Sequence, residues 1–171
     1  MAYAVLVKSK VAAKNVDSRN RAGQHTSALE NGCVGSLTLA AGTEVGTYAA
    51  PATGALTNLW MVASPEIVLT GSYKIGANDP RDFINAANTP FDAFLPDVGD
   101  VILATPDMFG GTKGANTYVV ATNAQTKLQW ASAAVTGLSL KLVSDTDFIS
   151  IGTGAIGSQR VTAYRFEVVA N

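Results

Sequence analysis

The sequence predicts a mainly β protein: a small β-barrel or sandwich with an extended N-terminal arm and a short helical connector. Three observations lead to this fold class. Short apolar runs rich in β-forming residues follow one another from residue 98 to the end of the chain, separated by Gly, Asn, Asp or Ser. Basic residues gather in a polar stretch near the start, and prolines change the pattern between residues 76 and 96.

The length of 171 residues fits one compact domain with an extended arm, because domains most often contain roughly 100 to 150 residues. A hydrophobic fraction of 47% supports a core that needs no disulfide or metal. We divide the sequence into an N-terminal arm or loop over residues 1–32, a β segment with the helical connector over 33–96, and a C-terminal β-barrel or sandwich over 97–171.

The N-terminal stretch is basic, since Asp17 is the only acidic residue among the first 21. We expect this arm to become ordered on an acidic surface of a neighbouring protein. Exposed ion pairs stabilise by only about 0 to 1 kcal/mol each, so the apolar run at residues 3–7 is expected to anchor the arm as an added strand. The predicted partner-binding residues are Tyr3, Lys8, Lys10, Lys14, Arg19 and Arg21.

The middle segment begins with strand-like patterns. Residues 33–40 form an apolar, Thr-containing run that predicts a strand, and residues 41–44 predict the turn that ends it. A near-continuous apolar run at residues 58–63 predicts a second strand, and residues 66–70 predict a third.

The connector has a helical signature. Residues 79–82 and 89–92 each combine a capping side chain, a proline at the first helical position and an acid near the start of the helix dipole. This pattern predicts two short helices or helical turns, the second of them closed by Pro96.

The C-terminal part contains six β-like runs: residues 98–105, 117–121, 127–131, 137–143, 148–151 and 160–169. Regular short strands with turn residues between them are typical of a small barrel or sandwich. In the last run every second residue is predicted to share one apolar face: Thr162, Tyr164, Phe166 and Val168.

Composition argues against several classes of function. A net charge of -1 gives neither the broad positive field of a nucleic-acid-binding protein nor a polybasic patch for a membrane. No run approaches the roughly 20 apolar residues of a membrane-spanning helix, and residues 3–7 are too short for a signal-peptide core, so we expect synthesis in a cytoplasm. One His, one Cys and 15% charged residues offer few catalytic groups, so we expect no enzyme activity, metal or cofactor.

Two glycine-rich segments resemble nucleotide-binding loops. Residues 152–157 read G-x-G-x-x-G, but that motif opens a helix toward a pyrophosphate, whereas residues 160–169 predict a strand. We therefore interpret these glycines as a β-hairpin turn. Residues 110–113 lack the spacing of a phosphate-binding loop and the helix that follows one, which favours a loop between strands.

His25 and Cys33 are the most reactive side chains in the sequence. Neither lies in a recognised nucleophile motif, so we interpret His25 as a solvated loop residue and Cys33 as a small core residue. Trp60 and Trp130 could form a sugar-stacking platform, but each lies within an apolar run, which favours a core position.

Carboxylates occur in close pairs, which we interpret as helix-cap or turn residues. Glycosidase chemistry from two distant carboxylates stays open at this point. The pairs are Asp79 with Asp82, Asp97 with Asp100, and Asp145 with Asp147.

Four segments carry a resemblance to a known class of protein: residues 58–66, 80–83, 98–102 and 160–169. Together they resemble small virion proteins of tailed bacteriophages, of the type that decorates or cements the head shell, and the similarity extends over most of the chain. The resemblance implies no catalytic residues. The chain lacks the Pro/Gly-rich N-terminus of some trimeric decoration proteins, which leaves the oligomeric state open.

We therefore expect a non-enzymatic virion structural protein that binds the outer surface of a phage head and decorates or cements the major capsid protein lattice. Expected partners are the major capsid protein or other virion subunits, with homo-oligomerisation as a further option, and neither nucleic acid nor membrane. The alternative is a carbohydrate- or receptor-binding β-module of a tail or fibre, which needs exposed aromatic side chains. A cryptic enzyme would need His25 in a cleft with an Asp or Glu.

Overall fold

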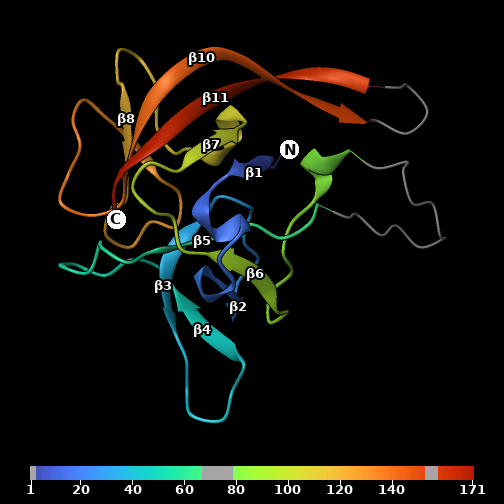
Figure 1. Ribbon diagram of the computed structural model, residues 1–171, viewed down its shortest axis with the longest axis vertical. Coiled ribbons are helices and arrows are strands. Elements are labelled where there is room, and N and C mark those ends of the chain that lie inside the picture. Colours follow the sequence, from blue (N-terminus) through green and yellow to red (C-terminus); the bar gives the residue numbers. More distant parts are fainter. Residues whose placement is uncertain (1–2, 67–78, 153–157) are drawn as a thin grey trace.

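The computed structural model describes residues 3–66, 79–152 and 158–171 and shows a mainly β architecture (Figure 1). The predicted fold class, a mainly β protein with a small barrel, is confirmed. Helical structure in the described residues is limited to four single 3-10 turns: η1 (Ala12–Lys14), η2 (Asp17–Arg19), η3 (Pro80–Asp82) and η4 (Pro106–Met108).

The strands form a closed barrel and an open sheet. The barrel contains, in spatial order, β2 (Asn20–Gln24), β4 (Val45–Ala49), β3 (Val34–Thr38), β5 (Trp60–Val62) and β6 (Phe91–Phe94). The open sheet contains, in order, β1 (Leu6–Lys10), β7 (Val101–Ala104), β11 (Ser158–Ala170), β10 (Ser139–Gly152), β8 (Tyr118–Val120) and β9 (Gln129–Ala131). The strands β2 and β4 pair in parallel, and the other named pairs are antiparallel.

The barrel lies in a different part of the chain from the one expected. It is formed by strands between residues 20 and 94, whereas the C-terminal strands β7 to β11 belong to the open sheet. Strands of both architectures alternate between two faces, so their side-chain pattern alone does not distinguish closure from an open edge. Closure depends on β2, which pairs with β4 on one side and β6 on the other.

The expected N-terminal arm is instead built into both units. The strand β1 forms the edge of the open sheet by pairing with β7, and β2 closes the barrel. Val5, Val11 and Ala13 are buried in this stretch. The polar composition of residues 14–24 was misleading because barrel closure uses backbone hydrogen bonds, which polar residues supply as well as apolar ones.

Two main clusters of buried side chains explain how the units pack. One fills the barrel and includes Tyr48, Trp60, Val62 and Phe91. The larger cluster joins the barrel to the open sheet. The strand β5 contributes to both, since Met61 faces the larger cluster while its two neighbours face the barrel interior, which accounts for the continuous apolar run in the sequence.

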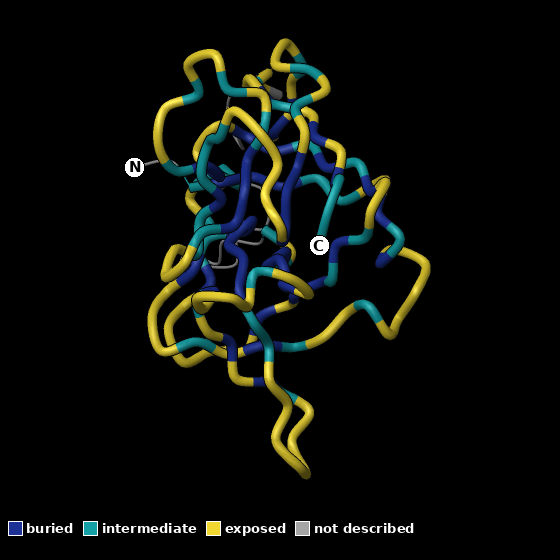
Figure 2. Tube along the Cα trace, turned by 90° about the vertical axis from the view of Figure 1, so that its left-hand side faces the viewer, coloured by how far each residue is buried: buried dark blue, intermediate teal, exposed yellow. Residues whose placement is uncertain are grey.

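Burial follows this layering in space. Buried segments gather in the centre of the molecule, whereas the β3–β4 turn projects from it and is exposed (Figure 2). Gly23 shows how closely the small barrel is packed, because a Cβ atom there would lie 2.9 Å from side-chain carbons of both Leu37 and Phe91.

The connector follows the sequence prediction in one place and departs from it in another. The turn η3 forms as expected, with the Asp79 carboxylate accepting a hydrogen bond from the Arg81 amide at 2.9 Å. The helical prediction for residues 89–92 is wrong, since β6 begins at Phe91. Phe91 and Ala93 point into the barrel while Asp92 is exposed, and this strand alternation prevails over the proline signal.

The strands β10 and β11 form a long ribbon that arches over the molecule (Figure 1). The predicted runs 137–143 and 148–151 merge into one strand, and its pairing with β11 shifts register at three places. Such irregularities are typical of β-bulges, which bend a strand and increase its twist. The expected strand at residues 66–70 lies almost wholly outside the described residues.

The ribbon buries opposite faces at its two ends. Near the body, Tyr164, Phe166 and Val168 face the main cluster, as the alternation predicted. Farther out, Ala163 on the opposite face is buried with Val5, Ile149 and Ile151 in a third, smaller cluster. Thr162 therefore becomes exposed although it shares a face with Phe166.

Candidate functional site

The predicted partner-binding residues do not form one free segment. Three of their cations have partners within the chain: Arg19 pairs with Asp97 at 2.8 Å, Arg21 lies 5.3 Å from the ring centroid of Trp60, and Lys8 donates to the Ala63 carbonyl at 3.2 Å. The amide of Tyr3 donates to the Arg81 carbonyl at 2.7 Å, whereas Lys10 and Lys14 are exposed. Whether these residues bind a partner stays a prediction.

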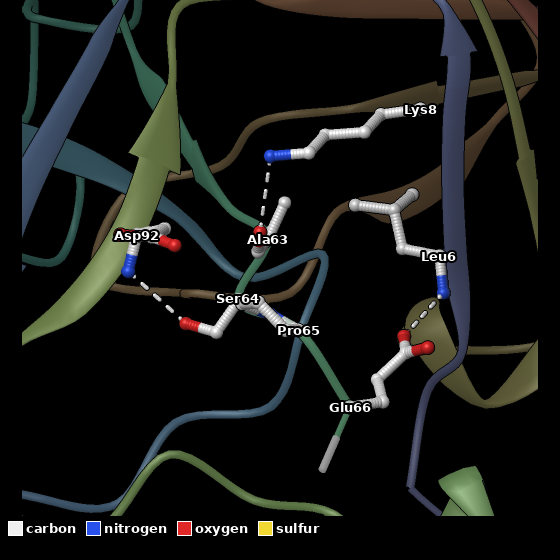
Figure 3. Close-up of a pocket in the computed structure, with 7 residues that line it drawn as sticks. All are labelled: Leu6, Lys8, Ala63, Ser64, Pro65, Glu66 and Asp92. Atoms are coloured by element: carbon white, nitrogen blue, oxygen red, sulfur yellow. Dashed lines mark hydrogen bonds between the residues drawn. The ribbon is translucent and has the colours of Figure 1, made fainter.

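Lys8 lies in a small cavity at the junction between β1 and the barrel (Figure 3). Its volume is about 210 Å³, below the roughly 300 to 1,000 Å³ of most small-ligand sites. The Lys8 amine points to Ala63 while the Glu66 carboxylate points to the Leu6 amide, so the two groups face different partners (Figure 3). Both groups are used in contacts between β1 and residues 63–66, which follow β5. We call this junction of the two units the seam.

Two carboxylates accept hydrogen bonds from the backbone at the start of β1. The Leu6 amide donates to Glu66 Oε1 at 3.1 Å, and the Ala4 amide donates to Glu30 Oε2 at 3.2 Å. Glu66 also accepts a hydrogen bond from the amide side chain of buried Asn31 at 3.1 Å. Burial raises the pKa of Glu66, while these hydrogen bonds act in the opposite direction. An edge strand covered in this way offers less backbone for pairing with another chain.

The outer part of the ribbon carries the clearest exposed cluster with recognition chemistry. Phe148 is 50% exposed, and the Arg160 guanidinium lies 4.3 Å from its ring centroid. Phe148 pairs with Thr162 and Ser150 pairs with Arg160, so the four side chains share one face. All four are exposed. We refer to Phe148, Ser150, Arg160 and Thr162 as the ribbon patch.

His25 and Cys33 have structural surroundings. The sulfur of Cys33 is buried in the barrel, and burial raises the pKa of its thiol, which disfavours a reactive thiolate. His25 is half-buried with its ring edge-on to Tyr48, and its Nδ1 lies 3.1 Å from the Ser27 amide. The cavity beside His25 has no Asp or Glu among the described residues that line it.

The carboxylate pairs are occupied by ordinary interactions. Asp79 caps η3, and hydrogen bonding from Arg81 lowers the pKa of Asp79. Asp100 accepts hydrogen bonds from the amides of Ala12 and Asp97, which holds a turn as predicted.

The pair Asp145 and Asp147 departs from the turn prediction, since both residues lie inside β10. They form ion pairs with Lys113 at 2.8 Å and Arg165 at 3.0 Å, respectively. These residues sit where the register of the ribbon shifts, and the turn-like composition of the segment corresponds to that irregularity.

The two tryptophans do not form a shared platform. Trp60 is 9% exposed and belongs to the barrel cluster. Trp130 is half-buried and packs with Phe109, Tyr164 and Phe166, at centroid distances of 5.5, 5.9 and 5.8 Å. Its ring therefore belongs mainly to the aromatic part of the core.

The described residues on either side of the first glycine-rich segment lie in paired strands, and the second segment lies in a loop. Residues 153–157 lie outside the described residues, but Gly152 pairs with Ser158 and a strand follows. Residues 110–113 lie between η4 and β8, as expected for a loop. In the described parts of the chain, no helix is long and apolar enough to cross a membrane, and no group of three or more His, Cys, Asp or Glu is placed to hold a metal ion.

Sequence reasoning missed the ribbon patch and the structural role of Glu66. Phe148 was assigned to a short strand, and its exposure follows only from the change of buried face along the ribbon. Residues two apart in a strand share a face, so Arg160 lies on the same face as Thr162. Once the register of the hairpin is known, the sequence therefore places Arg160 beside Phe148. Comparison of the chain with protein-family models, curated proteins and solved structures gave no match.

Proposed function

We propose that this protein is a non-enzymatic virion structural protein that decorates or cements the head of a tailed bacteriophage, with the ribbon patch as a contact to the major capsid protein. The observation that carries the proposal is an exposed Phe148 held beside Arg160 on an arched two-stranded ribbon. Aromatic and Arg side chains are enriched at the centres of protein interfaces. The resemblance of the sequence to head decoration proteins supports the choice of partner.

The chemistry of the patch favours a surface with apolar and acidic groups. Arg160 is its only charged member, so a neighbouring carboxylate on the partner would complement it. The patch alone is smaller than the roughly 1,200 to 2,000 Å² buried by a stable interface. Exposed Lys10 and Lys14 are candidates for a wider contact that sets orientation and association rate.

The test is cosedimentation of the purified protein with heads that lack it, followed by mass spectrometry of copy number relative to the major capsid protein. Phe148→Ala should weaken binding by about fivefold or more, because truncation of a central aromatic anchor costs about 1 to 4 kcal/mol. Val98→Ala is the matched control, since Val98 is 64% exposed and lies outside the patch.

Two results would reject this assignment. The protein could fail to bind the heads at all, or it could bind with an affinity that Phe148→Ala and Arg160→Ala leave unchanged. The second result would move the contact to another face of the molecule.

A further inference from the structure

A cavity opens at the end of the barrel where the parallel strands β2 and β4 finish. Its volume is about 450 Å³, within the roughly 300 to 1,000 Å³ of small-ligand sites. Neither the structural role proposed above nor the ribbon patch involves it. The lining residues are Gln24, His25, Thr26, Thr47, Tyr48, Ala49, Ala50 and Asn88.

Tyr48 is one of the lining residues of this barrel-end cavity, and its side chain is anchored in the barrel interior. The Tyr48 hydroxyl lies 3.0 Å from the Cys33 carbonyl and 2.8 Å from the Trp60 carbonyl, deep in the barrel. Its ring packs edge-on against Phe91 at a centroid distance of 5.2 Å and against His25 at 6.4 Å. The His25 ring is thus held in contact with the buried Tyr48 ring, which makes this side of the site largely preformed.

The rim of the cavity is joined by hydrogen bonds between two segments, residues 24–25 and residue 88. Gln24 Nε2 donates to the Asn88 carbonyl at 2.7 Å, and the Asn88 amide donates to the His25 carbonyl at 2.8 Å. Among the described residues, no hydrogen bond uses His25 Nε2, the hydroxyls of Thr26 and Thr47, or the side-chain amide of Asn88. These are the groups that a ligand could engage.

The lining chemistry selects a class of ligand. The described lining contains no Lys, Arg, Asp or Glu, so a phosphate, carboxylate or ammonium group would find no permanently charged partner there. Hydroxyl and amide groups instead match a neutral molecule with several hydroxyls, and the methyl groups of Ala49 and Ala50 offer an apolar contact for its C–H face. We infer that the barrel-end cavity binds a neutral carbohydrate unit of one or two rings.

The experiment is an NMR titration of the full-length, nitrogen-15-labelled protein with N-acetylglucosamine, galactose and maltose. Binding of at least one sugar should shift the amide signals of residues 24–26, 47–50 and 88. Single sugars bind weakly to open sites, so the titration extends to tens of millimolar. Glucose 6-phosphate is the charged comparison and should bind less well than the neutral sugars, because the described lining offers no permanent counter-charge.

A pair of variants ties binding to the cavity. Thr47→Val removes one hydroxyl while keeping a β-branched side chain, and it should weaken sugar binding about tenfold, the loss expected for one hydrogen bond. Thr146→Val, an exposed strand threonine on β10, is the matched control and should bind as the parent does. The signals outside the cavity verify that each variant is folded.

Three outcomes would overturn the inference. They are the absence of shifts with all three sugars, shifts confined to residues outside the cavity, and binding that Thr47→Val does not weaken. Tighter binding of glucose 6-phosphate than of the neutral sugars would equally contradict the assigned ligand class.

Discussion

The barrel and the β10–β11 ribbon differ in the length of their strands and in how those strands are paired. Barrel strands are three to five residues long, and each has a neighbour on both sides. The ribbon strands have 14 and 13 residues, but β8 and β7 pair only with their inner parts, at residues 139–141 and 164–167. The barrel thus removes its edges by closure. The two ribbon strands extend together beyond β7 and β8, where they pair with each other and display side chains on an exposed face.

This difference separates stability from recognition. The residues Met61, Val62 and Phe94 of the barrel strands are fully buried. The outer ribbon relies on the small cluster around Ile149 and Ile151, which are 8% and 4% exposed. Local opening is easiest where few buried apolar contacts hold an element, so the outer ribbon is expected to open before the barrel.

The largest expected effect comes from removing residues 1–24. This deletion takes away β1 and the barrel-closing strand β2, with buried Val5, Leu6, Val11 and Ala13. Each larger apolar side chain contributes about 1.5 to 3 kcal/mol by burial, and a whole domain is stable by only about 5 to 15 kcal/mol. We expect no cooperative unfolding transition in urea followed by circular dichroism.

The deletion of residues 1–24 also removes positive charge, and the double variant Lys10→Ala/Lys14→Ala is the control for that loss. Both side chains are exposed, so the change in the free energy of unfolding should stay within about 0.5 kcal/mol for each residue. A truncated protein that unfolds cooperatively would restore the arm interpretation and show that the barrel tolerates an open side.

Next in size is a direct comparison of one core residue from each region. Phe94→Ala should lower the free energy of unfolding by about 3 to 5 kcal/mol, because its ring is fully buried between barrel and sheet. Ile151→Ala should cost about 2 kcal/mol, the lower end for such a change, since its small cluster can collapse around the lost atoms.

Hydrogen exchange gives this comparison spatial detail. Ile151→Ala should accelerate exchange mainly in the outer parts of β10 and β11 and in β1, whereas Phe94→Ala should accelerate it in both units. Equal losses of stability with identical exchange patterns would show that barrel and ribbon open as one cooperative unit.

The seam between the units gives an intermediate effect that depends on pH. Glu66→Ala leaves the Leu6 backbone amide without its acceptor and removes one of the acceptors of the Asn31 side-chain amide, which keeps the Ser64 carbonyl; the change should cost about 1 to 3 kcal/mol. Glu66→Gln keeps an acceptor oxygen and removes a partly buried charge. Since burial raises the pKa of Glu66, the folded state holds its proton more tightly than the unfolded state does.

The parent protein should therefore lose stability as pH rises from the ordinary pKa of Glu toward the raised pKa of Glu66. Glu66→Gln should remove this loss, so its stability relative to the parent should increase over the same interval. Urea unfolding at a series of pH values measures the difference. Parallel curves for the two proteins would show that the pKa of Glu66 is the same in both states.

The sequence was informative about strands and less so about their partners. Residues 33–40 and 58–63 were recognised as strands because continuous or alternating apolar side chains reflect burial directly. The strand β2 was not, since its residues Asn20, Arg21 and Gln24 are exposed and only backbone pairing places them in the barrel. Pairing between distant segments leaves no local pattern.

The candidate site was the least predictable part of the molecule. Phe148 and Ile149 are adjacent apolar residues, and only the packing of β1 against the ribbon decides that Ile149 is buried while Phe148 is exposed. The cavity beside His25 likewise depends on the parallel alignment of β2 with β4, which lie more than twenty residues apart. In both places the residue types could be read from the sequence, but their neighbours in the folded structure could not.

The smallest expected effect on stability is in the ribbon patch. Phe148 keeps half of its surface exposed, and an exposed cation–π contact such as that with Arg160 contributes about 0.5 to 1 kcal/mol. Phe148→Ala and Arg160→Ala should each lower the free energy of unfolding by less than about 1 kcal/mol. Their double variant should cost less than the sum, because each single change already removes the shared contact. Urea unfolding of the four proteins measures this coupling. If Phe148→Ala costs as much as Ile151→Ala, Phe148 belongs to the core of the ribbon, and any loss of head binding would reflect misfolding. If the cost is small while head binding falls, the ring is displayed for a partner, as the contrast between closed barrel and open ribbon requires.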